Sequence, residues 1–200
     1  MYENVMIDIE TTGLVPWVNR ITSFAMVPFK IRKSRIQGDG RAPTGARFPP
    51  DIKFDRSDNS ETMKFREHYN IDTIEANVFD VQPLETIFRI LNEWINNKTM
   101  LWSKPATFDI IFLQSYYHQF NTPTPWHYRN TRCVNTFVWQ LGFDPRELFD
   151  NVTAGWPNLE PHNPIHDVEV QVAMLDYALY YSQNKIEAAA NPLPPPPVQT

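Results

Sequence analysis

Residues 4–13 read Asn-Val-Met-Ile-Asp-Ile-Glu-Thr-Thr-Gly and carry the clearest fold signal of the chain. The apolar and β-branched residues predict a strand, and Thr-Thr-Gly ends it with turn chemistry. Because side chains two apart in a strand share a face, Asp8 and Glu10 should point the same way. Two buried carboxylates side by side repel each other and lose hydration, which favours a cation between them. The alternative is an exposed strand end whose acids face water.

Outward from this strand, the apolar periodicity predicts an α/β domain. A second strand is expected over about residues 21–29, and a short one over 100–103. Helical spacing of apolar residues predicts helices over about residues 83–97, 107–119, 131–141 and 164–183. Strands first, then helices alternating with a further strand, indicate a mixed central β-sheet flanked by α-helices.

Two segments lie outside this pattern. Residues 30–63 are polar, with several Gly and Pro, and are predicted to form a loop insertion or a strand pair with extended tips. Six basic residues against one acid between positions 30 and 47 form a basic patch on a chain of net charge −5, and we expect Arg32, Lys33 and Arg35 to contact phosphates. Residues 185–200 are predicted to be a flexible Pro-rich tail, which leaves residues 1–184 as the domain.

Composition places the chain among soluble globular proteins. It has 200 residues, 42% hydrophobic and 20% charged, which is enough for one domain with a full core. No stretch reaches the roughly 18 apolar residues of a membrane span, and a strand stands where a signal peptide would. We therefore expect a cytoplasmic protein with no membrane partner. The single cysteine, Cys133, lies in the helical pattern of residues 131–141 and is predicted to be a buried structural thiol.

Further candidate site residues lie at the starts of two predicted helices. Asp109 begins the helix at 107–119, where it could also simply stabilise the helix N-terminus. Asn163 suits an N-cap and Pro164 the first helical position, so His162 lies just outside the last helix and Asp167 on its first turn. A loop histidine beside a carboxylate fits a general base next to a metal ligand. The alternative is a capped helix with a surface histidine and a first-turn acid.

These motifs together carry a family resemblance. Asp-x-Glu-Thr-Thr-Gly near the N-terminus, Phe-Asp in mid-chain and His-x4-Asp near the end resemble the DEDDh (DnaQ-like) 3′–5′ exonuclease superfamily, which has a ribonuclease H-like fold. Trp-Ser-Lys at 102–104, Thr-Phe-Asp at 107–109, Pro-Trp-His-Tyr-Arg at 125–129, Arg132 and His-Asn at 162–163 are similar to its exonuclease VIII-like and phage 3′–5′ exoribonuclease-type branch. The resemblance covers residues 4 to about 181.

The resemblance implies a function and a set of site residues. It makes Asp8, Glu10, Asp109 and Asp167 ligands of two divalent ions, Mg²⁺ or Mn²⁺, and His162 the general base, in a reaction that releases nucleoside monophosphates from a nucleic-acid 3′ end. It further marks a set of substrate-binding residues, namely Thr11, Thr12, Gly13, Leu14, Phe108 and Arg132. Relatives are often dimers, so a homodimer is open, as is a phage origin, which would place the protein in the host cytoplasm. Where relatives have Arg-Asp, this chain has Arg132-Cys133, so a role tied to that aspartate has no counterpart here.

Two other readings remain open at the level of sequence. His162 and His166 are four apart, as in some zinc hydrolases, although Pro164 between them starts the helix inside the pair. A nucleic-acid-binding module that has lost turnover is the second. RNA and DNA are not distinguished as substrates, since no residue advertises a contact with the 2′-hydroxyl.

Overall fold

A mixed six-stranded sheet forms the centre of the molecule in the computed structural model, which describes residues 2–33, 35–50 and 56–183. The central strand is β1 (Asn4–Thr11). Antiparallel to it runs β2 (Ile21–Arg32), whose outer edge pairs with β3 (Arg35–Gly38) and β4 (Thr44–Arg47). On the other side of β1 lie two parallel strands, β5 (Met100–Ser103) and β6 (Thr131–Cys133). The predicted mixed sheet is confirmed.

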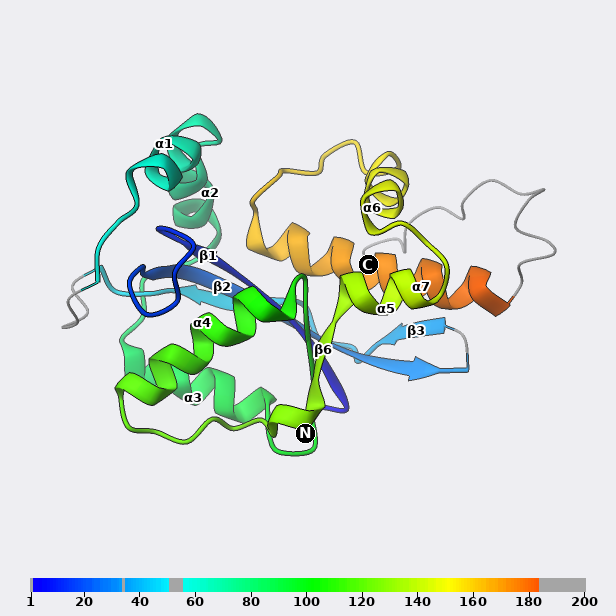
Figure 1. The fold of residues 1–200 in the computed structure, drawn as a ribbon, viewed down its shortest axis with the longest axis horizontal. Coiled ribbons are helices and arrows are strands. Elements are labelled where there is room, and N and C mark those ends of the chain that lie inside the picture. The colour runs from blue at the N-terminus through cyan, green and yellow to red at the C-terminus, as the bar shows by residue number, and fades with distance from the viewer. Residues whose placement is uncertain (1, 34, 51–55, 184–200) are drawn as a thin grey trace.

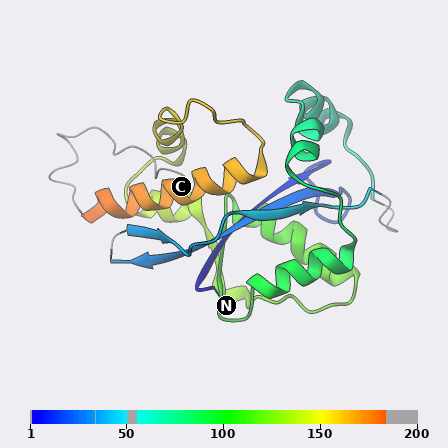
Figure 2. The same ribbon diagram turned by 180° about the vertical axis from the view of Figure 1, so that it is seen from behind.

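Helices cover both faces of this sheet. One face carries α3 (Leu84–Trp94) and α4 (Ala106–Gln119), and the other carries α5 (Val134–Gln140), α6 (Pro145–Thr153) and α7 (Pro164–Gln183) (Figures 1 and 2). A short 3-10 turn, Tyr128–Asn130, precedes β6. Two further helices, α1 (Ser60–His68) and α2 (Ile71–Val78), stand together at the end of the sheet where β1 terminates (Figure 1).

The alternation of side chains along β1 divides the core in two. Val5, Ile7 and Ile9 are buried against the side of α3 and α4, whereas Met6 is buried against the side of α5 to α7. Strand geometry places every second residue on one face. The even-numbered acids of β1 therefore emerge on the α7 side of the sheet, as the strand pattern predicts.

The predicted elements hold with three corrections. Cys133 is the last residue of β6 and half-buried, so the expected helix over residues 131–141 starts only at Val134. Neither the pair α1 and α2 nor α6 was predicted, because these helices have only eight or nine residues, too few to show a sustained helical period. In α1 the fully buried side chain is an arginine, Arg66, and in α6 it is Leu148 alone.

The described part of residues 30–63 forms the predicted strand pair and not a loop insertion. β2 continues to Arg32, β3 and β4 return along it, and α1 begins inside the segment, where Asn59 caps it by accepting the N–H groups of Glu61 and Thr62 at 3.1 and 3.0 Å. The predicted tail at 185–200 lies outside the described residues. Across the described part of the chain, no helix combines the length and apolar character needed to cross a membrane.

Candidate active site

Four carboxylates converge where β1 ends. Asp8 and Glu10 come from β1, Asp109 from the first turn of α4 and Asp167 from the first turn of α7. Strand β5 ends at Ser103 and leaves the outer edge of β1 unpaired beyond Met6, so the N–H of Ile9 donates instead to Asp109 Oδ1, at 3.2 Å. This bond ties Asp109, from the start of α4, to the backbone of Ile9, which lies between Asp8 and Glu10 in the strand.

Asp8 is buried and contacts α7. Its Oδ1 accepts a hydrogen bond from Gln171 Nε2 on α7 at 2.7 Å. Burial raises the pKa of Asp8 to about 6, against the opposing effects of the Gln171 donor and of the charges on Lys104 and His162. The carboxyl therefore keeps its proton to a higher pH than an ordinary aspartate does.

The other three carboxyls are displaced in the same direction. Burial, followed by repulsion from the charge on Asp8, raises the pKa of Glu10, of Asp109 and of Asp167 well above the usual range. Asp109 Oδ2 is also buried and, among the residues described, has no hydrogen-bond partner. Orphaned buried oxygens and mutually repelling carboxyls are what a cation-binding site looks like in the absence of its counter-charge.

His162 sits beside this cluster in the loop before α7. The local sequence acts as predicted: Asn163 Oδ1 accepts the N–H of Ile165 at 3.1 Å, and Pro164 is the first residue of the helix. His162 itself has a left-handed backbone, with φ of 62°, and its Nδ1 lies 3.8 Å from Glu10 Oε1. Burial lowers the pKa of His162, with Asp8 opposing, so the imidazole is neutral near pH 7 and able to accept a proton.

Three of these groups lie close enough together to hold a cation. Glu10, His162 and Asp167 each offer a ligand atom, and these atoms lie within 4.8 Å of one another. Within the described residues no such group includes His166, whose Nδ1 accepts the N–H of Glu160 at 3.0 Å. The zinc-type pairing of the two histidines thus has no support in the geometry.

The turn after β1 lies next to the carboxylates. Thr11 and Thr12 are buried: Thr11 Oγ1 donates to the carbonyl of Gly13 at 2.7 Å, and Thr12 Oγ1 accepts the N–H of Arg20 at 2.9 Å. A Cβ on Gly13 would lie 2.3 Å from the side chain of Asn19, so this position requires glycine. The side chain of Leu14 is 74% exposed. Of the four predicted substrate contacts in this turn, Leu14 is the side chain that is open to a ligand.

The remaining predicted contacts are not brought to the same point. Phe108 packs on the core beneath α4, with its ring centroid 4.8 Å from that of Phe112. Arg132, on β6, donates to the backbone carbonyls of Arg129 and Thr131 at 2.7 and 2.9 Å. Neither side chain joins the carboxylate cluster through any contact in the described structure.

The basic residues of the β2–β3 hairpin lie at the far end of the sheet. Asn4 pairs with Phe29 and Glu10 with Ser23, so Arg32 is displaced from Glu10 by about nine residues, or roughly 30 Å. Arg32 pairs with Glu3 at 2.6 Å and Arg35 with Asp176 at 2.8 Å, while Lys33 forms the turn. Their role as phosphate contacts stays a prediction, and it now concerns a surface remote from the carboxylates.

Sequence reasoning missed several residues that complete the site. Gln171 follows Asp167 by four positions on α7, and this helical spacing could have revealed it. Lys104 follows β5 and offsets the charges of Asp8 and Asp167. Phe65, on the unpredicted α1, packs against the ring of His162, and no local sequence signal pointed to it.

The mixed sheet with helices on both faces defines the class: a domain with the ribonuclease H-like fold. Within that class, the chain belongs to the family of Rv2179c-like 3′–5′ exoribonuclease domains, whose model matches residues 3–179. The predicted relation to the 3′–5′ exonucleases is thereby confirmed. Comparison with curated proteins gives no significant match.

Solved structures of Escherichia coli exonuclease I share the fold. Its zinc-bound complex with single-stranded DNA matches with a TM-score of 0.63 and 19% identity, over 91% of this chain and 41% of that one. Its complex with a dT13 oligonucleotide matches with a TM-score of 0.65 and 14% identity, over 94% and 43%. This chain therefore spans less than half the length of the exonuclease I chains it matches.

Proposed function

We propose that this domain removes nucleoside monophosphates one at a time from the 3′ end of a nucleic-acid strand by metal-dependent hydrolysis. The observation that carries the proposal is the convergence of two buried and two half-buried carboxyls with a neutral histidine at the end of β1, in a chain of the 3′–5′ exoribonuclease domain family. Strongly perturbed pKa values concentrate at functional sites, so this cluster is a candidate for the active site.

The residues present fit hard divalent cations. Asp8, Glu10, Asp109 and Asp167 would hold them, because carboxylate oxygens suit Mg²⁺ and Mn²⁺ and because Asp109 Oδ2 has no protein partner in the described structure. Two such ions would lower the pKa of a bound water and stabilise charge on the phosphoryl oxygens. The raised pKa values of all four carboxyls support this assignment, since bound cations would supply the missing attraction.

His162 is the general base in this proposal. Its imidazole is neutral near pH 7, reaches into the cluster beside Glu10, and would take the proton of the attacking water. The alternative is that His162 ligates a metal together with Glu10 and Asp167. Metal titration of His162→Ala separates the two roles, because a lost base leaves the metal affinity intact and a lost ligand lowers it by 10-fold or more.

For the substrate we propose single-stranded RNA, following the family description, with single-stranded DNA as the alternative that the exonuclease I complexes favour. The exposed side chain of Leu14 would pack against the terminal base, with the backbone of the preceding turn beside it. A 2′-hydroxyl contact would show as a preference for RNA.

The test is digestion of matched 5′-labelled RNA and DNA oligonucleotides in Mg²⁺, Mn²⁺, Zn²⁺ or chelator. We expect a ladder that shortens from the 3′ end, release of nucleoside 5′-monophosphates and no reaction in chelator. Binding without cleavage in every metal would favour the inactive binding module instead. Activity that needs Zn²⁺ and His166 would restore the zinc hydrolase.

A further inference from the structure

We propose that a buried ion pair, formed by Arg66 on α1 and Glu75 on α2, clamps these helices onto the end of β1 and thereby positions His162 and Glu10. The inference rests on the proposed function, because it adds two positioning residues to that reaction. Neither residue touches the reacting atoms in this account.

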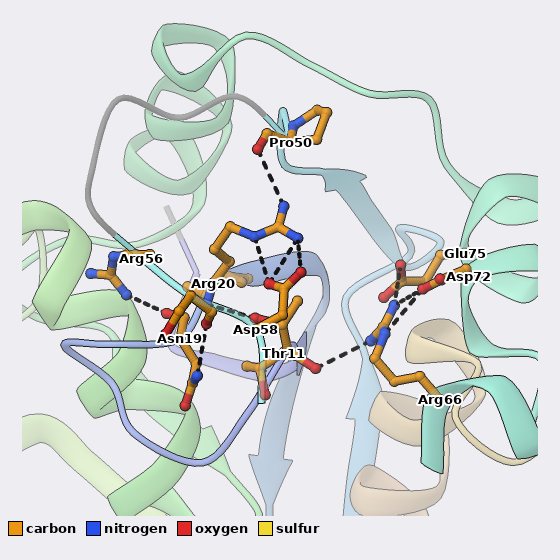
Figure 3. A network of polar contacts seen from close by, with 12 residues as sticks. Thr11, Asn19, Arg20, Pro50, Arg56, Asp58, Arg66, Asp72 and Glu75 are labelled. Carbon is orange, nitrogen blue, oxygen red and sulfur yellow. Dashed lines mark hydrogen bonds and ion pairs between the residues drawn. The ribbon is translucent and has the colours of Figure 1, made fainter. Parts of the chain in front are cut away.

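Arg66 is the inner part of the clamp. It is only 2% exposed, and its Nη2 lies 2.9 Å from Glu75 Oε2 and also pairs with Asp72. Its other terminal nitrogen, Nη1, donates to the carbonyl of Thr11 at 3.3 Å and lies 3.9 Å from Glu10 Oε2. Figure 3 shows the guanidinium between Thr11 on one side and the Asp72–Glu75 pair on the other. A single side chain thus joins α1, α2 and the catalytic end of β1.

Glu75 anchors the pair to the neighbouring strand. It is 1% exposed, and its Oε1 accepts hydrogen bonds from Thr22 Oγ1 at 2.6 Å and Ser23 Oγ at 2.9 Å. Ser23 is the residue of β2 that lies opposite Glu10 in the sheet register. Both ends of the ion pair are therefore tied to the strand positions that carry Glu10, one through β1 and the other through β2.

The same helix reaches His162. Phe65 and Tyr69 lie on either side of Arg66 at helical i, i+4 spacing, and each ring centroid is 5.0 Å from that of His162 in an edge-to-face arrangement. His162 has a left-handed backbone, a conformation that a non-glycine residue keeps only with support from its surroundings. A displacement of α1 would consequently move the imidazole.

Positioning explains this arrangement better than stability alone. A buried ion pair is weak evidence for stability, since apolar side chains of similar size commonly serve as well or better. This pair instead directs a donor to the Thr11 carbonyl and a charge toward Glu10. Displacing a catalytic group by about 1 Å can lower a rate by about 100-fold, so a remote clamp has a measurable effect on the reaction.

The experiment compares Glu75→Gln with wild type in kcat, KM and thermal unfolding. The amide can still accept from Thr22 and Ser23 but loses the charge that holds Arg66. We expect a folded protein whose kcat falls by about 10- to 100-fold with KM changed less than twofold. The matched control is Glu93→Gln in the exposed Arg89–Glu93 pair of α3, which should match wild type.

Two further measurements separate positioning from general destabilisation. In a His162→Ala background, Glu75→Gln should lower kcat by less than it does in the wild-type background, because one of the two groups that the ion pair positions is already gone. The imidazole NMR signals of His162 should also shift in Glu75→Gln. In Glu75→Asp, which keeps the negative charge, they should lie closer to their wild-type positions, with both variants measured at a temperature at which they are folded.

Several outcomes would overturn the inference. These are an undiminished kcat in Glu75→Gln, a full loss that persists without His162, unchanged imidazole signals, or a rise in KM alone, which would make α1 a substrate contact. An inactive wild-type protein would instead refute the proposed function, and the NMR comparison would still test the clamp.

Discussion

Replacing Asp8 with Asn should abolish turnover and yet stabilise the metal-free protein. Burial raises the pKa of Asp8 from its ordinary value of 3.8 to about 6. The folded protein holds this proton up to about pH 6, whereas the unfolded chain releases it near 3.8, so the free energy of unfolding falls as the pH rises through that interval. A difference of about two between the pKa values is worth about 3 kcal/mol above pH 7.

Asn escapes this penalty because it does not ionise. Its Oδ1 can still accept the hydrogen bond from Gln171 Nε2, so the packing of the site is kept. For a domain of this size, about 3 kcal/mol corresponds to a rise in melting temperature of roughly 6–12 °C. We expect this rise at pH 7.5 in chelator and only a small one at pH 4, where Asp8 is protonated in the folded wild type and about half protonated in the unfolded chain.

The assay is thermal unfolding, monitored by circular dichroism at both pH values, with and without Mn²⁺ at millimolar concentration. Wild type should gain stability from the metal, and Asp8→Asn should gain less, because ligand binding to the folded state raises stability by mass action. Asp176→Asn is the control, since Asp176 lies on α7, the helix that carries Gln171, but is paired with Arg35, and its replacement should not raise the melting temperature. An Asp8→Asn variant that melts at or below wild type in chelator at pH 7.5 would refute the reasoning.

Other predictions concern the base and the substrate surface. His162→Ala should lower kcat by roughly 10²- to 10⁴-fold and His166→Ala should be nearly neutral, as steady-state kinetics can measure; equal losses would mean the base is wrongly assigned. Leu14→Ala should raise KM for oligonucleotides without changing the melting temperature, because the side chain is exposed in the absence of substrate, and an unchanged KM would remove it from the substrate site. Neutralising Arg32, Lys33 and Arg35 together should leave KM for tetranucleotides unchanged, since the hairpin is about 30 Å from the carboxylates. For strands of about 20 nucleotides the same variant should raise KM and reduce the dependence of KM on salt concentration. An unchanged KM at both lengths would mean that the hairpin does not bind the substrate.

Local sequence determined the elements that carry the chemistry. Alternation along β1 placed Asp8 and Glu10 on one face, and the Asn163-Pro164 pair set the start of α7 and so the position of Asp167. These features depend on residues within a few positions of one another. That is why strand period and helix caps could be predicted without the rest of the fold.

Tertiary structure alone decided which polar residues are buried around the site. Helix α1 has no apolar stripe, because the residue that it buries is Arg66. The Arg66 side chain can be buried because it pairs with Glu75 and donates to the Thr11 carbonyl, and both partners lie on other elements. The raised pKa of Asp8 has the same origin, since it depends on burial by segments far apart in the chain.

Sheet register decided where the basic patch lies. A count of charges between positions 30 and 47 indicates a surface for phosphates, but it carries no direction. Because β2 runs antiparallel to β1, each residue added to its end carries the hairpin about 3.3 Å further from Glu10. Local sequence thus determined the positions of the candidate site residues, which lie on strands and helix starts that short patterns predict. Their supporting residues and their distance from the basic surface followed from long-range pairing that no local pattern encodes.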